Sequence, residues 1–437
     1  MLLNAADKAL WRLALPMIFS NITVPLLGLV DTAVIGHLDS PVYLGGVAVG
    51  ATATSFLFML LLFLRMSTTG LTAQAWGAKD PQRLARALVQ PLALALGAGV
   101  LIILLRLPLI DLALHIVGGS EAVLEQARRF LEIRWLSAPA SLANLVLLGW
   151  LLGVQYARAP VILLVVGNLL NIVLDLWLVM GLRMNVQGAA LATVTAEYAT
   201  LIIGLLMAKR VLTLRGVSLA MLKNAWRGDL RRLLALNRDI MLRSLLLQLC
   251  FGALTVFGAR LGSDIVAVNA VLMTMLTFTA YALDGFAYAV EAHSGQAYGA
   301  RDGSQLLEVW RAACRQSGMV ALAFALIYSL AGQYIIALLT SLPSLQQLAD
   351  RYLIWQTILP VVGVWCYLLD GMFIGATRGA EMRNSMAVAR RVAVTLLTLP
   401  VLGNHGLWLA LAVFLALRGL SLALIWRRHW RRGTWFS

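Results

Sequence analysis

Long apolar runs separated by shorter polar connections form the main pattern of this chain. Each run is long enough to cross a lipid bilayer as a helix, because one crossing needs about 20 mostly apolar residues. The runs lie near residues 9–36, 44–73, 88–112, 130–154, 159–181, 187–208, 239–259, 265–292, 316–339, 351–376, 386–402 and 405–426. The pattern therefore predicts an all-α membrane protein with twelve transmembrane helices.

The longest polar connection covers residues 209–238 and lies near the middle of the chain. It is basic, and it separates six predicted spans from six. We therefore expect an N-lobe at 1–208 with spans 1 to 6, a basic linker at 209–238, and a C-lobe at 239–437 with spans 7 to 12 and a tail.

A sequence repeat relates the two lobes. The segment from Gln74 to Asp80 reads QAWGAKD after span 2, and the segment from Gln296 to Asp302 reads QAYGARD after span 8. The same spacing, called the repeat offset below, pairs Gly149 with Gly371 and Gly153 with Gly375. Because six spans is an even number, both lobes enter the membrane in the same orientation. A pseudo-two-fold axis along the membrane normal follows, and this arrangement is typical of transporters that rock two bundles about a central site.

Composition supports the membrane assignment. Hydrophobic residues make up 61% of the chain and charged residues 13%, against roughly 25% charged residues in a soluble domain. The net charge of +15 would suggest nucleic-acid binding in a soluble protein. Here most Lys and Arg residues lie in the termini and the even-numbered connections, which predicts that both termini are cytoplasmic. The lipid bilayer is the expected partner, and nucleic acid is not.

Motifs for metal binding and catalysis are not evident in the sequence. Cys250, Cys314 and Cys366 lie in or beside apolar runs without the spacing of a metal or redox site. No HExxH or GxSxG motif occurs. We therefore expect no bound metal or cofactor and no enzyme, although an intramembrane enzyme stays as a distant alternative.

Span 1 contains the first candidate for functional chemistry. An acidic side chain at mid-membrane costs about 2.5 to 3.5 kcal/mol on insertion scales, so such a residue is a functional hypothesis by default. Asp31 lies deep in span 1, together with Pro16 and Pro25. Each proline removes a backbone donor and can bend the helix. A bendable helix with a titratable group indicates a proton-driven switch, and a structural carboxylate is the alternative.

Polar residues on spans 5 and 6 extend this candidate site. Asn168, Asn171 and Asp175 have the spacing i, i+3, i+7 and therefore share one helical face. Thr193 adds a hydroxyl within a run of small residues in span 6 that also favours close helix packing. Glu197, one turn further on, is a weaker candidate.

The C-lobe has acids of its own. Asp284, Tyr288 and Glu291 share a face of span 8, and Asp370 lies in span 10. The repeat does not duplicate this chemistry, since Asp31 and Asp175 correspond to Ala253 and Leu397 at the repeat offset. We therefore expect the lobes to have different tasks, with coupling in the N-lobe.

Several of these segments match a known family. They are Leu13 to Pro16, Leu29 to Thr32, the repeated Gln-Ala-Trp/Tyr-Gly-Ala segment, Leu170 to Asp175, and Gly188 to Thr193. The chain resembles the multidrug and toxic compound extrusion (MATE) family over essentially its whole length. Its opening stretch is similar to the bacterial DinF-like branch, named for DNA-damage inducibility.

The resemblance implies a secondary active multidrug efflux antiporter of the bacterial inner membrane. Such a protein exports cationic or amphipathic compounds in exchange for protons by alternating access, and we expect it to act as a monomer. Asp31 would be the proton-linked carboxylate, Pro16 the bending point of span 1, and Asn171, Asp175 and Thr193 the network partners. The family's frequent Leu-Asp-Pro in span 5 reads Leu-Asp175-Leu here, so bending of span 5 is not expected on this ground.

Two alternatives stay open within transport. Sodium-coupled relatives are described as using acids in spans 7 and 10, whereas here span 10 has Asp370 and the core of span 7 offers only Gln248. This difference favours protons over sodium. A lipid-linked saccharide flippase is the other alternative, and such proteins tend to have extra spans or a strongly cationic central cavity.

Overall fold

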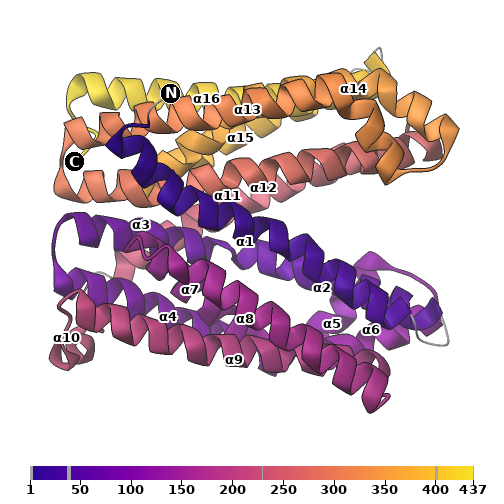
Figure 1. Cartoon of the computed structure of the whole chain (residues 1–437), viewed down its shortest axis with the longest axis horizontal. Helices are drawn as coiled ribbons and strands as arrows, with labels where there is room; N and C mark the ends of the chain where they lie inside the picture. Colours follow the sequence, from indigo (N-terminus) through magenta and orange to yellow (C-terminus); the bar gives the residue numbers. More distant parts are fainter. Residues whose placement is uncertain (1–2, 37–40, 229, 399–401, 437) are drawn as a thin grey trace. The chain divides into compact units, whose positions relative to one another are not determined.

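The computed structural model describes residues 3–36, 41–228, 230–398 and 402–436, apart from the side chains of 23–33, 36 and 41. Every regular element in these ranges is a helix (Figure 1). The elements are α1 (Ala5–Gly36), α2 (Pro41–Leu61), α3 (Phe63–Gly77), α4 (Pro81–Leu104), α5 (Arg106–Val117), α6 (Glu121–Arg134), η1 (Trp135–Ser137), α7 (Ala138–Gly153), α8 (Arg158–Asp175), η2 (Leu176–Gly181), α9 (Asn185–Leu214), α10 (Leu219–Asn224), α11 (Leu230–Ala259), α12 (Ser263–Ala300), α13 (Gly303–Leu339), α14 (Pro343–Gly375), α15 (Gly379–Leu397) and α16 (Gly403–Arg432).

Ten helices among the described residues are long and apolar enough to cross a membrane. They overlap with predicted spans 2 to 10 and 12, where α2 and α3 together form span 2, and α6 and α7 together form span 4. The remaining two predicted spans fall on α1, which has 32 residues, and on α15, which carries Glu381, Arg383, Arg390 and Arg391. The all-helical membrane fold is confirmed, and the count of twelve crossings stays a prediction.

The chain forms two compact units. The N-terminal unit consists of Ile22–Leu233, and the C-terminal unit consists of Met1–Asn21 and Leu234–Ser437. The division expected from the sequence was 1–208 and 239–437 with a linker between. The observed grouping instead assigns Met1–Asn21 to the C-terminal unit and linker residues 209–233 to the N-terminal unit.

The first half of α1 belongs to the C-terminal unit because its polar side chains bond to α12 and α13. Arg315 Nη2 lies 3.0 Å from Asp7 Oδ1, and Trp11 Nε1 donates to Gln316 Oε1 over 2.9 Å. Asn21 Nδ2 donates to the carbonyl of Tyr281 over 3.1 Å. These contacts link residues about 260 to 308 positions apart in the sequence, a pairing that no local pattern indicates.

The repeated heptapeptide ends one helix and begins the next in the same way in both units. Lys79 and Arg301 have left-handed backbones with φ of 54° and 53°. The next backbone amide, of Asp80 or Asp302, donates to the carbonyl five residues back. Each aspartate then caps the following helix, since Asp80 Oδ1 accepts from the amide of Arg83 and Asp302 Oδ1 from that of Gln305. The repeat is therefore conformational as well as chemical.

The paired glycines mark matching helix crossings. A Cβ at Gly149 would lie 2.6 Å from the Arg65 carbonyl oxygen, and a Cβ at Gly371 would lie 2.6 Å from that of Ala287. Arg65 and Ala287 are themselves related by the repeat offset. The crossing of α3 with α7 thus recurs as the crossing of α12 with α14, and only glycine allows such close approach.

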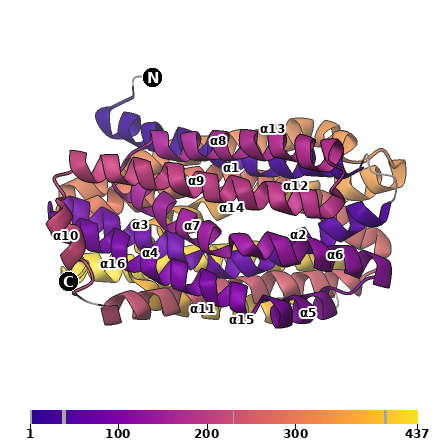
Figure 2. The ribbon, with the colours of Figure 1, turned by 90° about the horizontal axis from the view of Figure 1, so that it is seen from below.

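The helices of each unit pack around a separate core. In the N-terminal unit α7 packs against α3 and α4, α2 lies along α6, and α8 lies along α9 (Figure 2). In the C-terminal unit α14 packs against α12, α13 and α16, and α15 lies along α16 (Figure 1). Trp150, fully buried in α7, donates its indole N–H to the Leu84 carbonyl of α4 over 3.1 Å, which satisfies its polar group inside the core.

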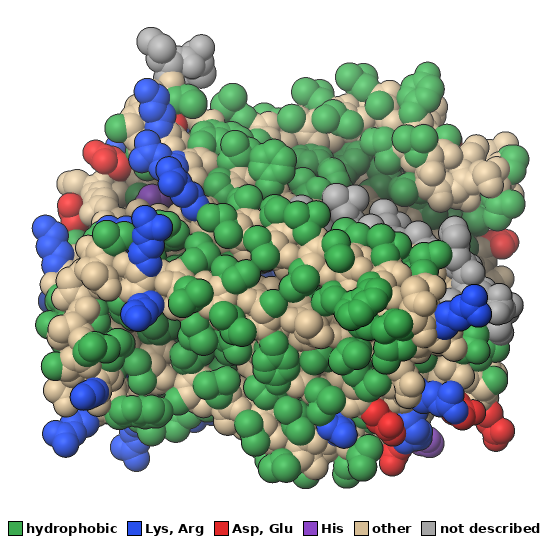
Figure 3. Space-filling view, turned by 60° about the horizontal axis from the view of Figure 1, so that its bottom comes forward, with side chains coloured by type: hydrophobic (Ala, Val, Ile, Leu, Met, Phe, Trp, Pro, Cys, Tyr) green, Lys and Arg blue, Asp and Glu red, His purple; other side chains and the backbone are tan. Residues whose placement is uncertain are grey.

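The surface is apolar where a bilayer would contact it. On the face shown in Figure 3, hydrophobic side chains cover most of the surface, and Lys and Arg side chains gather toward its margins. Exposed apolar residues on α8 and α9 include Leu169, Val173, Ile202 and Leu206. In water such a surface would drive aggregation, whereas in lipid it faces a solvent of its own polarity.

Candidate functional site

The polar face of α8 is buried. Asn171 and Asp175 are 2% and 1% exposed, whereas Leu169 and Val173 on the other side of the same helix are 59% and 61% exposed. Asn168, one turn before Asn171, is half-buried. The predicted stripe on span 5 therefore lies on the interior side of a helix whose opposite side is apolar and exposed.

Asp175 lies where α8 changes its winding. It is the last residue of α8, and the helix continues as the π-helix η2 from Leu176 to Gly181. The amide of Leu182 correspondingly donates to the carbonyl of Trp177, five residues back, over 2.9 Å. Local π-helices are frequent at functional sites. The irregularity at Asp175 is thus achieved without the proline that the family pattern has next to this aspartate.

Thr193 and Glu197 lie on α9, which packs beside α8. Thr193 is half-buried, and its hydroxyl donates to the Ala189 carbonyl of its own helix over 3.2 Å. Glu197 accepts from Asn144 Nδ2 of α7 at both its carbonyl and its carboxylate, over 3.1 and 3.2 Å. Glu197 therefore fastens α9 to α7.

Two of the predicted residues have side chains outside the described part of the chain. Asp31 and Pro25 lie on the helical backbone of α1, but their side chains are not among the described ones. Pro16 is half-buried in the portion of α1 that belongs to the C-terminal unit. The roles predicted for these three residues stay predictions.

A buried acceptor is left on the α8 face. Asn171 Oδ1 has no hydrogen-bond partner among the described residues, although it is inaccessible to solvent. Such a group costs free energy unless a donor reaches it. A bound water, a protonated carboxyl or a cargo N–H group can supply that donor.

In the C-terminal unit Asp370 is held between two arginines. Its Oδ2 accepts from Arg243 Nη2 over 2.8 Å and from Arg418 Nη2, and all three side chains are buried. The Arg418 guanidinium also lies 5.4 Å from the centre of the Phe414 ring. Three helices, α11, α14 and α16, are joined by this ion cluster.

One acid of α12, Asp284, interacts electrostatically with this cluster. Glu291 is buried, whereas Asp284 and Tyr288 are half-buried. The charge of Asp284 acts on Arg418 together with that of Asp370. Asp370, on α14, is compensated by arginines from two other helices.

The predicted site residues did not include three arginines that are buried inside helices: Arg65, Arg243 and Arg418. The signal was available, because each interrupts or borders an apolar run. A basic residue inside a membrane span indicates a functional or structural site just as an acidic residue does.

Comparison with known proteins shows consistent likenesses. A family model described as MatE matches residues 16–177 and 240–402. DNA damage-inducible protein F of Escherichia coli (strain K12) is 86% identical over 436 residues, which cover 100% of this chain and 95% of that protein. The probable multidrug resistance protein NorM of Acinetobacter baylyi is 23% identical over 431 residues, 96% of this chain and 94% of that one.

The fold is also similar to a solved structure. A MOP superfamily transporter from Pyrococcus furiosus matches with a TM-score of 0.84 over 98% of this chain and 96% of that chain, at 23% sequence identity. At this identity the likeness concerns the fold alone.

Proposed function

Because this chain belongs to the MatE family of membrane transporters, we propose that it is a secondary active antiporter which exports cationic or amphipathic compounds in exchange for protons. The family and the fold are those of transporters and not of enzymes. What the proposal adds is the coupling ion, the class of cargo and the alternation between two open states.

The observation that carries the proposal is the buried polar face of α8. Asp175 and Asn171 are almost inaccessible on a helix whose other side is exposed and apolar. Retaining a carboxyl group there is costly in a membrane protein and favours a functional explanation. The repeat leaves this face unduplicated, which supports a task specific to the N-terminal unit.

Charge exchange at this face supplies the coupling. A deprotonated carboxylate in a medium of low dielectric constant attracts a cationic cargo strongly. Protonation removes that charge, so proton and cargo compete for the same group. Asp31 and Asp175 would carry the exchange, and Asn171 and Thr193 would supply hydrogen bonds. If proton and cargo favour different conformations, their fluxes become coupled.

The position of α1 supports its predicted role as the moving element. The change from one compact unit to the other falls between Asn21 and Ile22, which lie between Pro16 and Pro25. Proline weakens the helical hydrogen-bond ladder locally. Bending between these prolines would therefore act on a helix whose two ends belong to different units.

Protons are favoured over sodium by the surroundings of Asp370. Sodium coupling through the C-terminal unit needs a carboxylate free to bind the ion. The charge of Asp370 is already opposed by Arg243 and Arg418. We therefore propose proton coupling. Sodium binding in the N-terminal unit is the alternative, and efflux driven by a sodium gradient would support it.

The test is efflux driven by a pH gradient in proteoliposomes. We expect the wild type to export a fluorescent lipophilic cation when a proton gradient is imposed and Asp31→Asn to lose this coupled transport. Asp350→Asn is the matched control, because Asp350 is an exposed carboxylate at the beginning of α14. Full coupled efflux by Asp31→Asn would refute the mechanism.

The same vesicles distinguish the alternatives. A sodium gradient that drives efflux at constant pH would favour the sodium antiporter, and flipping of a fluorescent lipid-linked saccharide without drug efflux would favour the flippase. We further propose a monomer in the bacterial inner membrane with cytoplasmic termini. Labelling of single cysteines in the linker and tail from each side of intact cells tests that topology.

A further inference from the structure

Three arginines line one cavity in the N-terminal unit, next to the linker. Arg83 and Arg86 lie on α4, Arg232 lies on α11, and together they line a cavity of about 450 Å³ that includes its open mouth. Leu71, Ala87, Gln90, Pro91 and Leu233 complete the lining. The cavity is therefore cationic on one part of its wall and apolar on another.

Local structure forces the arginines together. Asp80 caps α4, so Arg83 and Arg86 fall on its first two turns at spacing i, i+3 and share one side of the helix. The linker then covers them, since Gln90 Nε2 donates to the Trp226 carbonyl over 3.4 Å and Gln82 Nε2 to that of Met221 over 3.4 Å.

Gly228 fits the linker against the arginine cluster. Its φ is +147°, and a Cβ at this position would lie 2.3 Å from Arg86 Nε. The Arg86 guanidinium is thus pressed against linker backbone. Among the described residues its Nε has no hydrogen-bond partner, although it is buried.

Positive charge outweighs negative charge around Arg83. The charges of Arg232 and Arg86 both act on Arg83, against the single described acid Asp80. Asp80 Oδ1 is already engaged in capping the helix. Arg232 Nη2 donates to the neutral amide oxygen of Gln74 over 3.3 Å. Like charges gathered around one cavity favour a bound anion.

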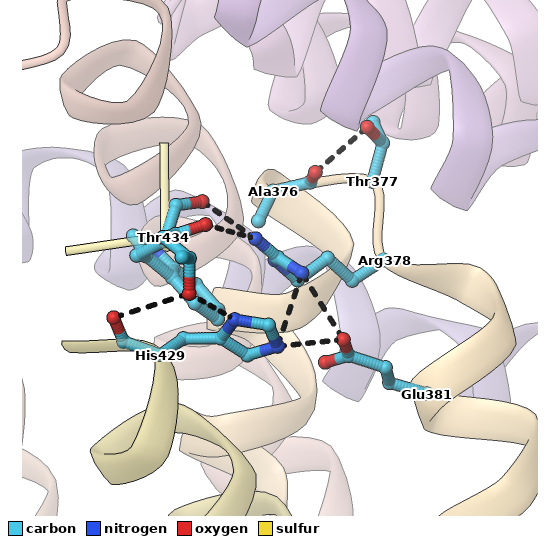
Figure 4. Close-up of polar contacts among 7 residues, drawn as sticks. Ala376, Thr377, Arg378, Glu381, His429 and Thr434 are labelled. Atoms are coloured by element: carbon cyan, nitrogen blue, oxygen red, sulfur yellow. Dashed lines mark hydrogen bonds and ion pairs between the residues drawn. The ribbon is translucent and has the colours of Figure 1, made fainter. Parts of the chain in front are cut away.

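The second repeat shows that the fold does not require these arginines. At the repeat offset Gln305 and Glu308 stand in the places of Arg83 and Arg86. In the C-terminal unit, by contrast, residues of the chain itself bind the guanidinium group of an arginine. Arg378 donates to Glu381 Oε1 over 3.0 Å and to the tail carbonyls of Thr434 and Trp435 over 3.0 and 2.7 Å (Figure 4).

We propose that the cavity lined by Arg83, Arg86 and Arg232 binds a phosphate group, either the headgroup of an anionic phospholipid or a free phosphate ion. Guanidinium groups match phosphate oxygens with paired hydrogen bonds. Basic pockets between membrane helices bind anionic headgroups on the cytoplasmic side, which is where the proposed topology places this linker. The apolar part of the wall suits the glycerol and first acyl carbons of a lipid.

Binding is measured on the purified full-length protein in phosphatidylcholine nanodiscs, without any transport assay. One arm adds phosphatidylglycerol or cardiolipin to the nanodisc, and the other titrates inorganic phosphate. We expect a rise in Tm in at least one arm, and we expect high salt to reduce it. A rise with the lipids alone identifies a headgroup site, and a rise with inorganic phosphate identifies a site for the free ion.

Variants locate the effect. Arg86→Gln and Arg232→Gln should each weaken binding about tenfold, since each removes charge-assisted hydrogen bonds. Arg227→Gln is the matched control, because Arg227 is an exposed linker arginine outside the cavity and its loss should leave binding within about twofold. Arg86→Lys retains the charge and should bind between the wild type and the Gln variant.

The proposal is overturned if neither lipid nor phosphate raises the Tm of the wild type, or if Arg227→Gln weakens binding as much as Arg86→Gln. If Arg86→Gln does not fold, Arg232→Gln and Arg86→Lys still decide the question. Because no transport is measured, this outcome is independent of the proposed antiport.

Discussion

The two units treat a buried aspartate in opposite ways. Asp370 in the C-terminal unit lies between the guanidinium groups of Arg243 and Arg418, so the chain itself opposes its charge. Asp175 in the N-terminal unit follows Asn171 on a buried face, next to a change from α-helix to π-helix. One aspartate is fixed in an ion cluster that joins three helices. The other lies on an irregular helix beside an amide oxygen that has no described donor.

We interpret Asp370 as a structural carboxylate, and we propose Asp175 as one that exchanges protons. Loss of the Asp370 charge would leave the buried charges of Arg243 and Arg418 without compensation. Asp175 lies instead at a change of helix winding, a position that is frequent at functional sites. The difference predicts that neutralising the two aspartates will affect different properties of the protein.

The largest expected effect is on transport by Asp175→Asn. This variant should reduce pH-driven efflux to the level of protein-free vesicles, because the exchangeable charge is lost while the shape of the side chain is kept. Its Tm should stay within a few degrees of the wild type. Efflux of a fluorescent cation is measured in proteoliposomes. Thermal unfolding is measured for both proteins in one detergent. Wild-type efflux together with a strongly lowered Tm would reverse the assignment of the two aspartates.

The second effect is on stability and concerns Asp370→Asn. Removing one partner of a buried ion cluster typically costs about 3 to 5 kcal/mol, because the remaining charges lose their compensation. We expect this loss in the free energy of unfolding, measured in mixed micelles with increasing denaturant. Asp350→Asn again serves as the control, and Asp370→Asn combined with Arg418→Gln should recover part of the loss. An unchanged unfolding curve for Asp370→Asn would remove the structural role.

The third effect tests whether the two units share their architecture where their chemistry differs. Gly149→Ala and Gly371→Ala should each cost about 1 to 3 kcal/mol, since each new Cβ would meet a backbone carbonyl oxygen at 2.6 Å. Gly97→Ala and Gly318→Ala are the controls, because nothing lies within 4 Å of either new Cβ. Both controls should be neutral or slightly stabilising. Similar losses at the two crossings, measured by chemical unfolding, would support the repeat, whereas a loss at only one would break the equivalence.

The smallest effect concerns the ion pair that fastens α1. Burial by itself would raise the pKa of Asp7, but hydrogen bonds from Arg315, the Asn4 backbone and Gln316, with the charge of Arg315, hold this pKa below its ordinary value. The pair stabilises the folded protein at neutral pH, and this contribution disappears as pH falls through the lowered pKa. Arg315 is 47% exposed, so the contribution should stay below about 1 kcal/mol.

Asp7→Asn should therefore lower the Tm slightly at pH 7, and the difference from the wild type should shrink below about pH 4 as the wild-type carboxyl becomes protonated. Thermal unfolding measured in parallel over this pH range provides the check. A difference that grows on acidification would contradict the direction of the pKa shift.

Much of the fold could be predicted from local sequence. Apolar runs located the long helices, and the heptapeptide repeat located two helix ends whose backbones and aspartate caps agree. The glycine pairs at the same offset proved to be two equivalent crossings. These features are local or periodic, so a single sequence contains them.

The sites were harder to predict from sequence because the residues that form them are far apart along the chain. Arg243 and Arg418 meet Asp370 from 127 and 48 residues away, and the choice of partner depends on how three helices pack. The grouping of Met1–Asn21 with the second half of the chain rests on contacts of the same kind. The spacing of Asn171 and Asp175 predicted that they share one helical face, whereas the π-helix after Asp175 had no signal such as proline.

The docking of α1 onto α12 and α13 also bears on how the chain is made. Trp11 and Asp7 leave the ribosome about 300 residues before Gln316 and Arg315, which is roughly 15 to 60 s at typical synthesis rates. During that interval the first helix is already available for insertion while its bonding partners do not yet exist. The C-terminal unit can therefore close only late in synthesis, after α13 has been made.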